Sequence, residues 1–375
     1  MQTPEDCAQN PWGSEALNIT QLSLMRAFRA CGVEQVIGIS FPGSSSWHNP
    51  HRIKQSKKTT LEPGIEIWEP PFLALGPFQP PSQFVACLLN LARGAKPGAF
   101  LISNPVSRIS VPALIMSRAW HTPITIIASD LSPHTTASNV LRKSQLMLQT
   151  TITRHAPGVI VFSNHLGRDL RPTRPWRRMV RPPSKDLLEL SPVSPDLNSR
   201  IAYYAGTMAE VAGADLFLQA THYIEDSSYR FWFSGRGPLD DAIHIAAEKD
   251  PRITHWGFVN REKYCELLQQ ANVLINPRPS YLLENRYNFP SKLMEYMAAG
   301  RPIISTATSD IAEYYADAII LLDDETPERL AQLIQQVCEM PVDKQIALGQ
   351  RARQHVENET WEAQAQRILD FMQSL

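Results

Sequence analysis

Short runs of hydrophobic, mostly β-branched residues recur along the chain and alternate with longer amphipathic segments. We predict strands at QVIGIS from Gln35, AFLIS from Ala99, PITIIA from Pro123, GVIVF from Gly158, RIAYYAG from Arg200, RFWFSG from Arg230, VLINP from Val273, PIIST from Pro302 and AIILL from Ala318. The segment from Ser14 to Cys31 instead places Leu17, Leu24 and Phe28 on one helical stripe, and Gly32 follows its end. Strands that alternate with helices in this way predict an α/β protein with parallel sheets.

The length predicts two domains. A chain of 375 residues exceeds one compact core, since a domain usually has about 100–200 residues. The proline- and arginine-rich stretch from Arg168 to Lys185 is typical of a crossover between domains, because proline removes backbone donors and resists helix. We expect a first domain over residues 1–185, a second over 186–359, and a helix over 360–375 that packs back on the first.

Composition narrows the class of protein. The net charge is −1, with 36 basic against 37 acidic side chains, so no overall field attracts nucleic acid. Five scattered cysteines lack the close pairs of a zinc site or a disulfide framework, which favours a reducing cytoplasm. No apolar run reaches the roughly 18–20 residues that span a bilayer, and MQTPEDCAQN is unlike a signal peptide. We expect a cytoplasmic protein.

Glycine and basic residues follow several predicted strands of the second half. In a parallel sheet, ligands bind beyond the carboxyl ends of the strands, and glycine there allows backbone to approach a ligand closely. Each glycine alone is more often only a turn, but their order indicates a site. The candidates are Gly206, Thr207, Gly235, Arg236, Gly237, Gly257, Phe258, Val259 and Arg278.

The segment PSKLMEYMAAG predicts a helix that opens near Ser291 and stops at Gly300. The free amides and positive dipole end at its start suit a diphosphate, and Lys292 adds a cation. Glu295 lies one turn further on the same face, where its carboxylate can accept both hydroxyls of a ribose. The alternative for Glu295 is that it only solvates the helix surface.

These motifs resemble the retaining glycosyltransferases of the GT4 group, the glycosyl transferases group 1. The resemblance runs in order through YYAGTMAEVAGADLFLQA, FSGRGP, ITHWGFVNREKYCELLQQANVLINPRPS, FPSKLMEYMAAGRPIIST and LLDDETPERLAQLIQQV. It implies the GT-B fold, in which two Rossmann-like domains with parallel sheets face each other across a cleft. The first domain would bind the acceptor and the second the nucleotide-sugar donor. Gly206, Ser291 and Lys292 would approach the diphosphate, Gly257 to Val259 the base, and Glu295 the ribose.

The sequence also departs from that family. The family often has two glutamates eight positions apart, whereas Tyr287 stands eight before Glu295, and Glu284 is near but out of register. The basic residues of the first loop of the donor domain are absent, so Lys292, Arg236 or Arg278 are candidates to replace them. In the first half, Gly13 and Ser14 resemble the acceptor-side turn, while MQTPEDCAQN is a poor first strand.

Three residues are candidates for catalysis. Asp130 and His134 follow PITIIAS, where relatives carry a catalytic histidine or aspartate, and Glu284 is the third. Asp130 is as well interpreted as a residue that caps a loop as it is as a catalytic residue. For His134, a structural role without part in catalysis is the preferred interpretation. The sequence has no Asp-x-Asp pair, so we expect neither a metal nor another cofactor.

The resemblance predicts transfer of a sugar, with retention, from a nucleoside diphosphate, UDP or GDP, to a saccharide or a polyprenyl-diphosphate-linked acceptor. The alternatives are a non-catalytic nucleotide-sugar-binding protein, since several family residues are missing, and a sugar-nucleotide 2-epimerase. Six arginines, with Trp176 among them, suit an anionic membrane surface at its cytoplasmic face or form a solvated linker; they are Arg168, Arg171, Arg174, Arg177, Arg178 and Arg181. A nucleic-acid partner is not expected, because no recognition module surrounds them.

Overall fold

The computed structural model describes residues 15–41, 53–74, 78–129, 140–190 and 200–375. The chain divides into two units. Unit 1 comprises Met1–Phe162, Leu166–Val180 and Trp361–Leu375, and unit 2 comprises Ser163–His165 and Arg181–Thr360. The C-terminal segment therefore belongs with the N-terminal part of the chain, and three residues near the middle of the sequence belong with unit 2.

Unit 2 contains one six-stranded sheet whose pairs are all parallel. Its strands are β10 (Arg200–Thr207), β11 (Tyr229–Arg236), β12 (Ile253–His255), β13 (Val273–Asn276), β14 (Ile303–Thr306) and β15 (Ile320–Leu322). They lie in the order β12-β11-β10-β13-β14-β15. The chain thus builds outward from β10 in one direction and then from β13 in the other, which makes the β10/β13 boundary a topological switch point.

Helices precede, separate and follow these strands along the chain. They are α7 (Lys185–Glu189), α8 (Ala214–Ala220), α9 (Asp240–Lys249), α10 (Arg261–Gln270), α11 (Leu283–Tyr287), α12 (Ser291–Ala299), α13 (Ile311–Tyr315), α14 (Pro327–Cys338) and α15 (Val342–Gln354), with 3-10 turns at Glu210–Ala212 and Thr221–Tyr223. Local sequence sets several of their ends. The Asn260 side chain accepts from the Lys263 amide at the start of α10, and Thr326 accepts from the Arg329 amide at the start of α14.

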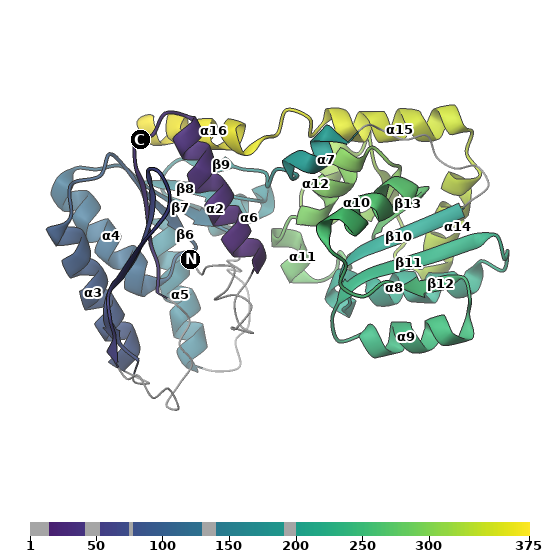
Figure 1. Ribbon diagram of the computed structural model, residues 1–375, viewed down its shortest axis with the longest axis horizontal. Helices are drawn as coiled ribbons and strands as arrows, with labels where there is room; N and C mark the ends of the chain where they lie inside the picture. Colours follow the sequence, from purple (N-terminus) through teal and green to yellow (C-terminus); the bar gives the residue numbers. More distant parts are fainter. Residues whose placement is uncertain (1–14, 42–52, 75–77, 130–139, 191–199) are drawn as a thin grey trace. The chain divides into compact units, whose positions relative to one another are not determined.

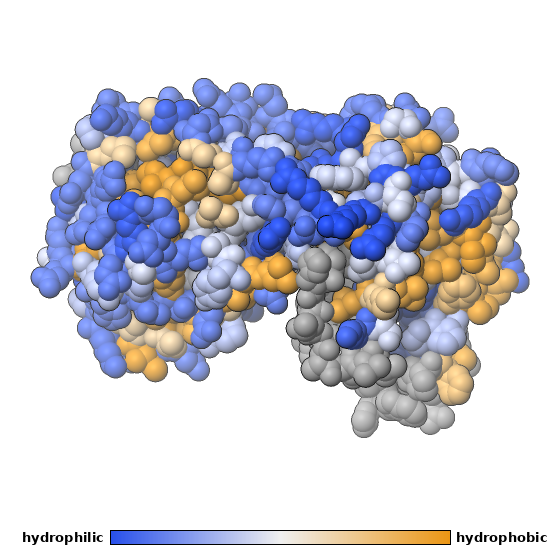
Figure 2. Space-filling view, turned by 180° about the vertical axis from the view of Figure 1, so that it is seen from behind, coloured by the Kyte–Doolittle hydropathy of each residue, from blue (hydrophilic) through white to orange (hydrophobic). Residues whose placement is uncertain are grey.

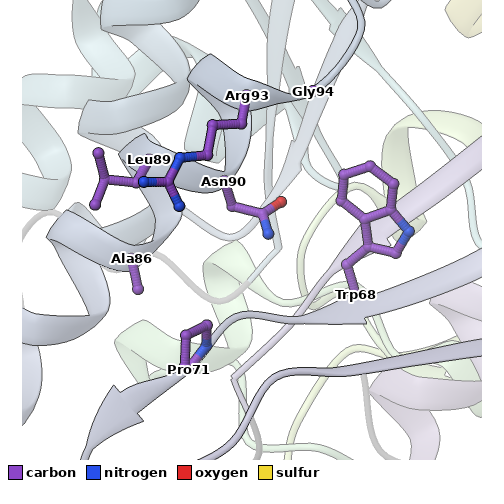
Figure 3. Close-up of a pocket in the computed structure, with 7 residues that line it drawn as sticks. All are labelled: Trp68, Pro71, Ala86, Leu89, Asn90, Arg93 and Gly94. Atoms are coloured by element: carbon purple, nitrogen blue, oxygen red, sulfur yellow. The ribbon is translucent and has the colours of Figure 1, made fainter.

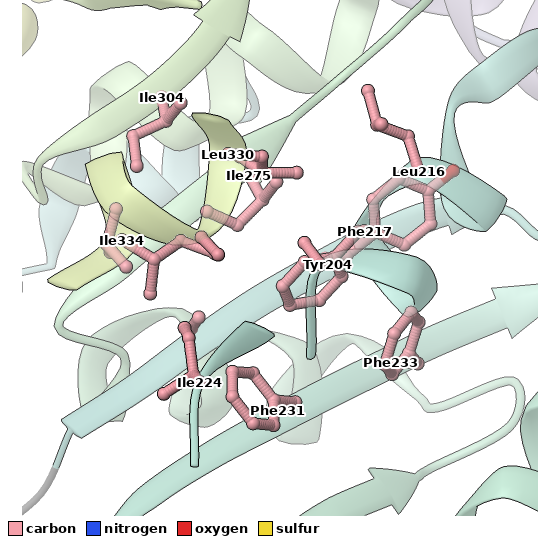
Figure 4. Packing of buried hydrophobic residues seen from close by; sticks show 14 of the residues in the cluster. Tyr204, Leu216, Phe217, Ile224, Phe231, Phe233, Ile275, Ile304, Leu330 and Ile334 are labelled. Atoms are coloured by element: carbon pink, nitrogen blue, oxygen red, sulfur yellow. The ribbon is translucent and has the colours of Figure 1, made fainter. Parts of the chain in front are cut away.

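Aromatic rings fill the core of unit 2 between the sheet and helices α8 and α14 (Figure 4). Phe217 of α8 lies 4.7 Å, centroid to centroid, from Phe233 of β11, and Leu330 and Ile334 of α14 are fully buried beside Ile275. Burying each such side chain contributes about 1.5–3 kcal/mol. The long apolar strands are the consequence of a sheet covered on both faces.

Unit 1 has its strands in three groups. A parallel sheet contains β6 (Phe100–Ser103), β7 (Ile124–Ala128), β8 (Gly158–Val161) and β9 (Trp176–Arg178) in that order. A second sheet pairs β1 (Val36–Ile39) parallel to β4 (Ile65–Glu69), and β4 antiparallel to β3 (Lys57–Glu62). The third group is the antiparallel pair β2 (Ile53–Lys54) and β5 (Phe72–Leu73).

The helices of unit 1 are α2 (Glu15–Ala30), α3 (Gln79–Arg93), α4 (Ser107–Trp120), α5 (Val140–Arg154), α6 (Asn164–Leu170), whose first residues belong to unit 2, and α16 (Trp361–Gln373). Helices α2 and α16, from opposite ends of the chain, pack side by side. Leu24 and Phe28 of α2 share a core with Ile368 and Phe371 of α16. The terminal helix is thus part of the hydrophobic core of unit 1.

The predicted α/β class and each of the nine predicted strands are confirmed. The stretch from Arg168 to Lys185, interpreted as a crossover between domains, also contains a strand that was not predicted: Trp176–Arg178 forms the edge strand β9, parallel to β8. The strand escaped notice because it is short and two of its three residues are arginines. Its packing is visible at Gly167, where an added Cβ would lie 2.5 Å from the Trp176 ring.

Exposed hydrophobic residues are dispersed among polar ones. Figure 2 shows hydrophobic patches in orange bordered by hydrophilic residues in blue on the face opposite to that of Figure 1. Among the described residues, no helix is long and apolar enough to cross a membrane.

Candidate functional site

The carboxyl ends of the unit 2 strands bring most of the sequence-predicted residues to one edge. Gly206 and Thr207 end β10, Gly235 and Arg236 end β11, and Arg278 follows β13. Because the pairs are parallel, these ends lie together, and the switch point between β10 and β13 is where a ligand crevice is expected.

The loops on the two sides of the switch point are packed tightly together. Gly213, with φ +78°, approaches so closely that an added Cβ would lie 2.0 Å from the Pro277 carbonyl oxygen. The buried Asn285 amide donates to the carbonyl oxygens of Val211 and Pro279, both at 2.9 Å. These contacts fix the backbone on which Arg278 is carried.

Some glycines at this edge are required by close contact with neighbouring backbone, whereas another faces open space. Gly206 is paired with Gly235 in register, and a Cβ on Gly235, with φ +141°, would lie 1.8 Å from the Gly206 carbonyl oxygen. A Cβ on Gly237 would lie 2.4 Å from the Met208 carbonyl oxygen. For Gly235 and Gly237 the reason for glycine is therefore the neighbouring backbone. Gly257, with φ +62°, has nothing within 4 Å of an added Cβ.

Arg278 is a half-buried cation beside the switch point. Burial lowers the pKa of its guanidinium, and the charged influence that opposes this comes from the buried Tyr204 and not from a carboxylate. No ion pair to Arg278 occurs among the described residues. A guanidinium stays protonated in proteins, so an enclosed one without a carboxylate is suited to an anionic ligand.

Helix α12 is fastened to the end of β10. The buried Tyr296 hydroxyl accepts from the Ala205 amide at 2.7 Å and donates to the Ala205 carbonyl oxygen at 3.1 Å. Pro290 precedes the helix and no side chain caps it, so the amides of Ser291 and Lys292 lack intrahelical partners. Gly300, with φ +69°, ends the helix as expected from the sequence.

Glu295 is the centre of a charged cluster on α12 and α10. Its carboxylate accepts from Lys292 Nζ at 2.8 Å, from the Tyr264 hydroxyl at 2.8 Å and from Arg261 Nη1 at 3.4 Å. Burial acts to raise the pKa of Glu295, but Lys292, Arg261 and the Tyr264 hydrogen bond outweigh it and hold the pKa below its usual value. Glu295 is therefore a carboxylate with three of its roughly four acceptor positions occupied.

Lys292 is less available to a phosphate than its sequence position indicates. Its ammonium is bound to Glu295 and lies 4.1 Å from the centroid of the Tyr264 ring. Arg278, with no such partner, is the better placed of the three candidate cations.

Asp186 and Arg261 complete the cluster and were missed by the sequence analysis. Arg261 Nε donates to Asp186 at 2.6 Å. Burial alone would lower the pKa of the Arg261 guanidinium, but the hydrogen bond to Asp186 outweighs burial and raises that pKa. Burial would raise the pKa of Asp186, yet the bonds from Arg261 and Ser184 lower it to about 2. Only the spacing of Arg261 and Tyr264 on one face of a helix could have indicated Arg261, and Asp186 lay at the edge of the predicted linker.

Arg236 and Phe258 form an exposed pair at the ends of β11 and β12. The guanidinium carbon lies 4.7 Å from the centroid of the Phe258 ring, which is 63% exposed. An exposed aromatic face with a cation beside it is suited to stacking on a planar ring. Thr207 is exposed, Val259 is half-buried at the same edge, and Glu284 is exposed on α11.

Four predicted residues, Gly13, Ser14, Asp130 and His134, lie outside the described residues. Within the described ranges, no group of three or more His, Cys, Asp or Glu side chains could hold a metal ion.

A separate hollow of about 260 Å³ lies in unit 1 between β4 and the C-terminal part of α3 (Figure 3). Its lining consists of Trp68, Pro71, Ala86, Leu89, Asn90, Arg93 and Gly94. None of these is a predicted site residue, so the hollow is distinct from the edge described above.

Part of the chain matches a known protein family in sequence. Residues 199–340, which lie in unit 2, match the model of the glycosyl transferases group 1. No curated protein matches the chain in sequence.

Solved structures are similar to the whole chain in fold. Sucrose-phosphate synthase from Thermosynechococcus elongatus is 18% identical with a TM-score of 0.69, over 96% of this chain and 93% of that one. The α,α-trehalose-phosphate synthase (UDP-forming) from Burkholderia xenovorans, solved with glucose-6-phosphate, is 8% identical with a TM-score of 0.69, over 96% and 97%. HepE from Anabaena, solved with UDP, is 15% identical with a TM-score of 0.64, over 84% and 87%. The chain has the GT-B fold.

Proposed function

We propose that this chain is a nucleotide-sugar-dependent glycosyltransferase that works with retention and without a metal ion. Unit 2, with its group 1 glycosyltransferase match, is the donor unit, and unit 1 is the acceptor unit. The observation that carries the proposal is Arg278, an enclosed cation without a carboxylate partner at the switch point of a Rossmann-type sheet.

The three parts of the donor, its diphosphate, ribose and base, bind to different residues at the carboxyl edge of the unit 2 sheet. The diphosphate meets Arg278 and the free amides at the start of α12, where cations and helix dipole stabilise the charge that grows on the leaving group. One ribose hydroxyl bonds to Glu295 at the acceptor position that Lys292, Tyr264 and Arg261 leave open, and the second displaces one of these donors. The base stacks near Phe258 and Arg236, beside the backbone of Gly257. The donor is a UDP- or GDP-sugar, and HepE, which is similar in fold, was solved with UDP.

The acceptor is a saccharide or a polyprenyl-diphosphate-linked sugar, received by unit 1. Gly13 and Ser14 are candidates for binding the acceptor, Asp130 and His134 are candidates for assisting the reaction, and Glu284 is the candidate on the donor side. A peripheral place at the cytoplasmic face of a membrane fits a lipid-linked acceptor.

Titration calorimetry with UDP, GDP, ADP and the corresponding nucleosides tests the donor site. One diphosphate should bind clearly more tightly than its nucleoside, and Glu295→Ala should weaken that binding by about 1.5–3 kcal/mol through loss of the ribose bonds. Glu295→Ala also releases Lys292, so Lys292→Ala serves as the matched control and should have a smaller effect. Failure of all three diphosphates to bind would refute the proposal.

A non-catalytic nucleotide-sugar-binding protein is the second candidate. Two observations favour it: Tyr287 stands in place of the family's first glutamate, and Glu295 is already bound by three side chains. Incubation of the protein with the UDP- or GDP-sugar that binds, with and without acceptors, distinguishes the two. Binding without hydrolysis or transfer would select the second candidate.

A further inference from the structure

Arg108 in unit 1 is a half-buried cation that the proposed donor chemistry does not use. It lies in the first turn of α4, directly after the loop that follows β6. Its Nε is buried and forms no hydrogen bond, and no ion pair to Arg108 occurs among the described residues. Burial lowers the pKa of the guanidinium, and no neighbouring acid opposes that effect. A buried Nε without a partner costs stability, and an anionic ligand that accepts from it would offset that cost when bound.

The backbone around Arg108 is held in place by a network at the carboxyl ends of β6 and β7. The Asn104 side-chain oxygen accepts from the Ser129 amide at 3.1 Å and from the Ser129 hydroxyl at 2.6 Å. Asn104 itself has φ +60°, a strained conformation that recurs at functional sites, and its amide donates to the Ile127 carbonyl oxygen at 2.9 Å. On the other side, the Gln21 amide donates to the Ser103 hydroxyl at 3.1 Å.

This edge of the sheet is where a ligand of unit 1 is expected. Ligands of parallel sheets lie beyond the carboxyl ends of the strands, and side chains on a helix lean toward its N-terminal end, which here follows β6. The first turn of α4 contains no acidic residue. Asp130, a candidate catalytic residue, follows Ser129 directly in the sequence.

We propose that Arg108 binds an anionic group of the acceptor, a phosphate, and so restricts the acceptor to phosphate-bearing sugars. Identifying the ligand as the acceptor rests on the proposed transferase function, whereas the binding of a phosphate by Arg108 concerns unit 1 alone. The phosphate could belong to a soluble sugar phosphate or to a lipid-linked sugar. Both sources offer the same two oxygens to the guanidinium, and experiment separates them.

The full-length protein is titrated with glucose 6-phosphate and with glucose, and separately sedimented with phosphatidylcholine vesicles with and without polyprenyl phosphate. The phosphate-bearing member of one pair should bind about tenfold more tightly or better than its neutral counterpart. Arg108→Gln should abolish this preference, and Arg108→Lys should restore part of it. Arg118→Gln, at the other end of the same helix, is the matched control and should leave it unchanged. The pair that shows the preference identifies the source.

Two readouts keep the outcomes distinct. The affinity for UDP and GDP, measured on the same variants, should be the same in Arg108→Gln as in the wild type. If the wild type binds neither nucleotide, the proposed donor site is refuted, but the proposed role of Arg108 is not. The melting temperature of Arg108→Gln should equal or exceed that of the wild type, because an enclosed unpaired charge is removed. A wild type with no phosphate preference in either arm, or an Arg108→Gln variant that keeps it, would overturn the proposal.

Discussion

The two units of this chain position their ligand edges by different means. In unit 2 the carboxyl edge is fixed by backbone against backbone, as at Gly213 and Pro277, and by the Asn285 side chain, which bridges the loops after β10 and β13. In unit 1 the described edge is held by side chains, with Asn104 bridging to Ser129 and Gln21 to Ser103. Backbone packing tolerates little substitution, whereas side-chain bridges can be exchanged. An enzyme that keeps one type of donor and varies its acceptor would benefit from that difference.

The units resemble each other in one respect. Each has a half-buried arginine close to the carboxyl edge of its parallel sheet, Arg278 in unit 2 and Arg108 in unit 1, and neither has a carboxylate partner among the residues that the structure describes. Two other candidate-site cations of unit 2, Lys292 and Arg261, are instead paired with Glu295 and Asp186. Unpaired charge is thus retained where an anionic ligand would meet it.

The largest expected effect breaks the backbone packing of unit 2. Gly235→Ala should lower the free energy of unfolding by about 3 kcal/mol or more, since the backbone strain and the clash with the Gly206 carbonyl act together. Gly257→Ala, which has space but a positive φ, should cost only about 1–2 kcal/mol. Gly98→Ala in unit 1, where nothing lies within 4 Å, is the control. Urea denaturation measures all three, and equal losses would show that the packing at Gly235 does not matter.

The next effect separates the candidate cations. Arg278→Ala should weaken nucleoside diphosphate binding by about 1.5–3 kcal/mol while leaving nucleoside binding nearly unchanged, because only the diphosphate meets the charge. Lys292→Ala should lose less, since Glu295 already binds that ammonium. Calorimetry with UDP and uridine distinguishes the two cations. If Lys292→Ala loses more affinity for UDP than Arg278→Ala does, the diphosphate binds at the start of α12 and not at Arg278.

Sequence patterns predicted five of the six strands of unit 2, because runs of apolar residues mark them. They did not predict the three-residue strand β12. They predicted Arg278 only as one of three cations, since burial and the absence of a carboxylate partner depend on tertiary structure. Asp186, about 75 positions from Arg261 in the chain, is paired with it only through folding. Arg108 carries no motif at all. The sequence pattern predicts where strands end and candidate residues follow them, but it does not show which charges are already paired in the folded chain.

A smaller effect concerns the surface of unit 1. Arg171, Arg174 and Arg177 are exposed near β9, and each should add about 1 kcal/mol to binding of an anionic bilayer. Replacing all three by Gln should release the protein from phosphatidylserine vesicles in a sedimentation assay, as should salt. The matched control has the same net charge change in unit 2, with Lys249, Lys344 and Arg351 replaced by Gln. If the wild-type protein stays in the supernatant at low salt, the arginine-rich stretch does not bind membranes and is an edge strand and linker only.

The smallest effect concerns pH and the cluster around Arg261. The pKa of Asp186 is about 2 in the folded chain and about 3.8 in an ordinary carboxyl group, so the folded state binds its proton less readily than the unfolded state. Its contribution to stability is therefore complete above about pH 4 and is lost as the pH falls toward 2. Since the Asp186 side chain is 47% exposed, solvent screening should hold this contribution below about 1 kcal/mol. Asp186→Asn should lower stability at pH 7 by that amount and make the loss between pH 4 and 2 shallower, whereas Glu225→Gln, an exposed acid of the same unit, should alter neither. If urea denaturation gives Asp186→Asn the wild-type slope across this range, the bond to Arg261 contributes nothing to folding, and the cluster on α10 and α12 is held by Glu295 alone.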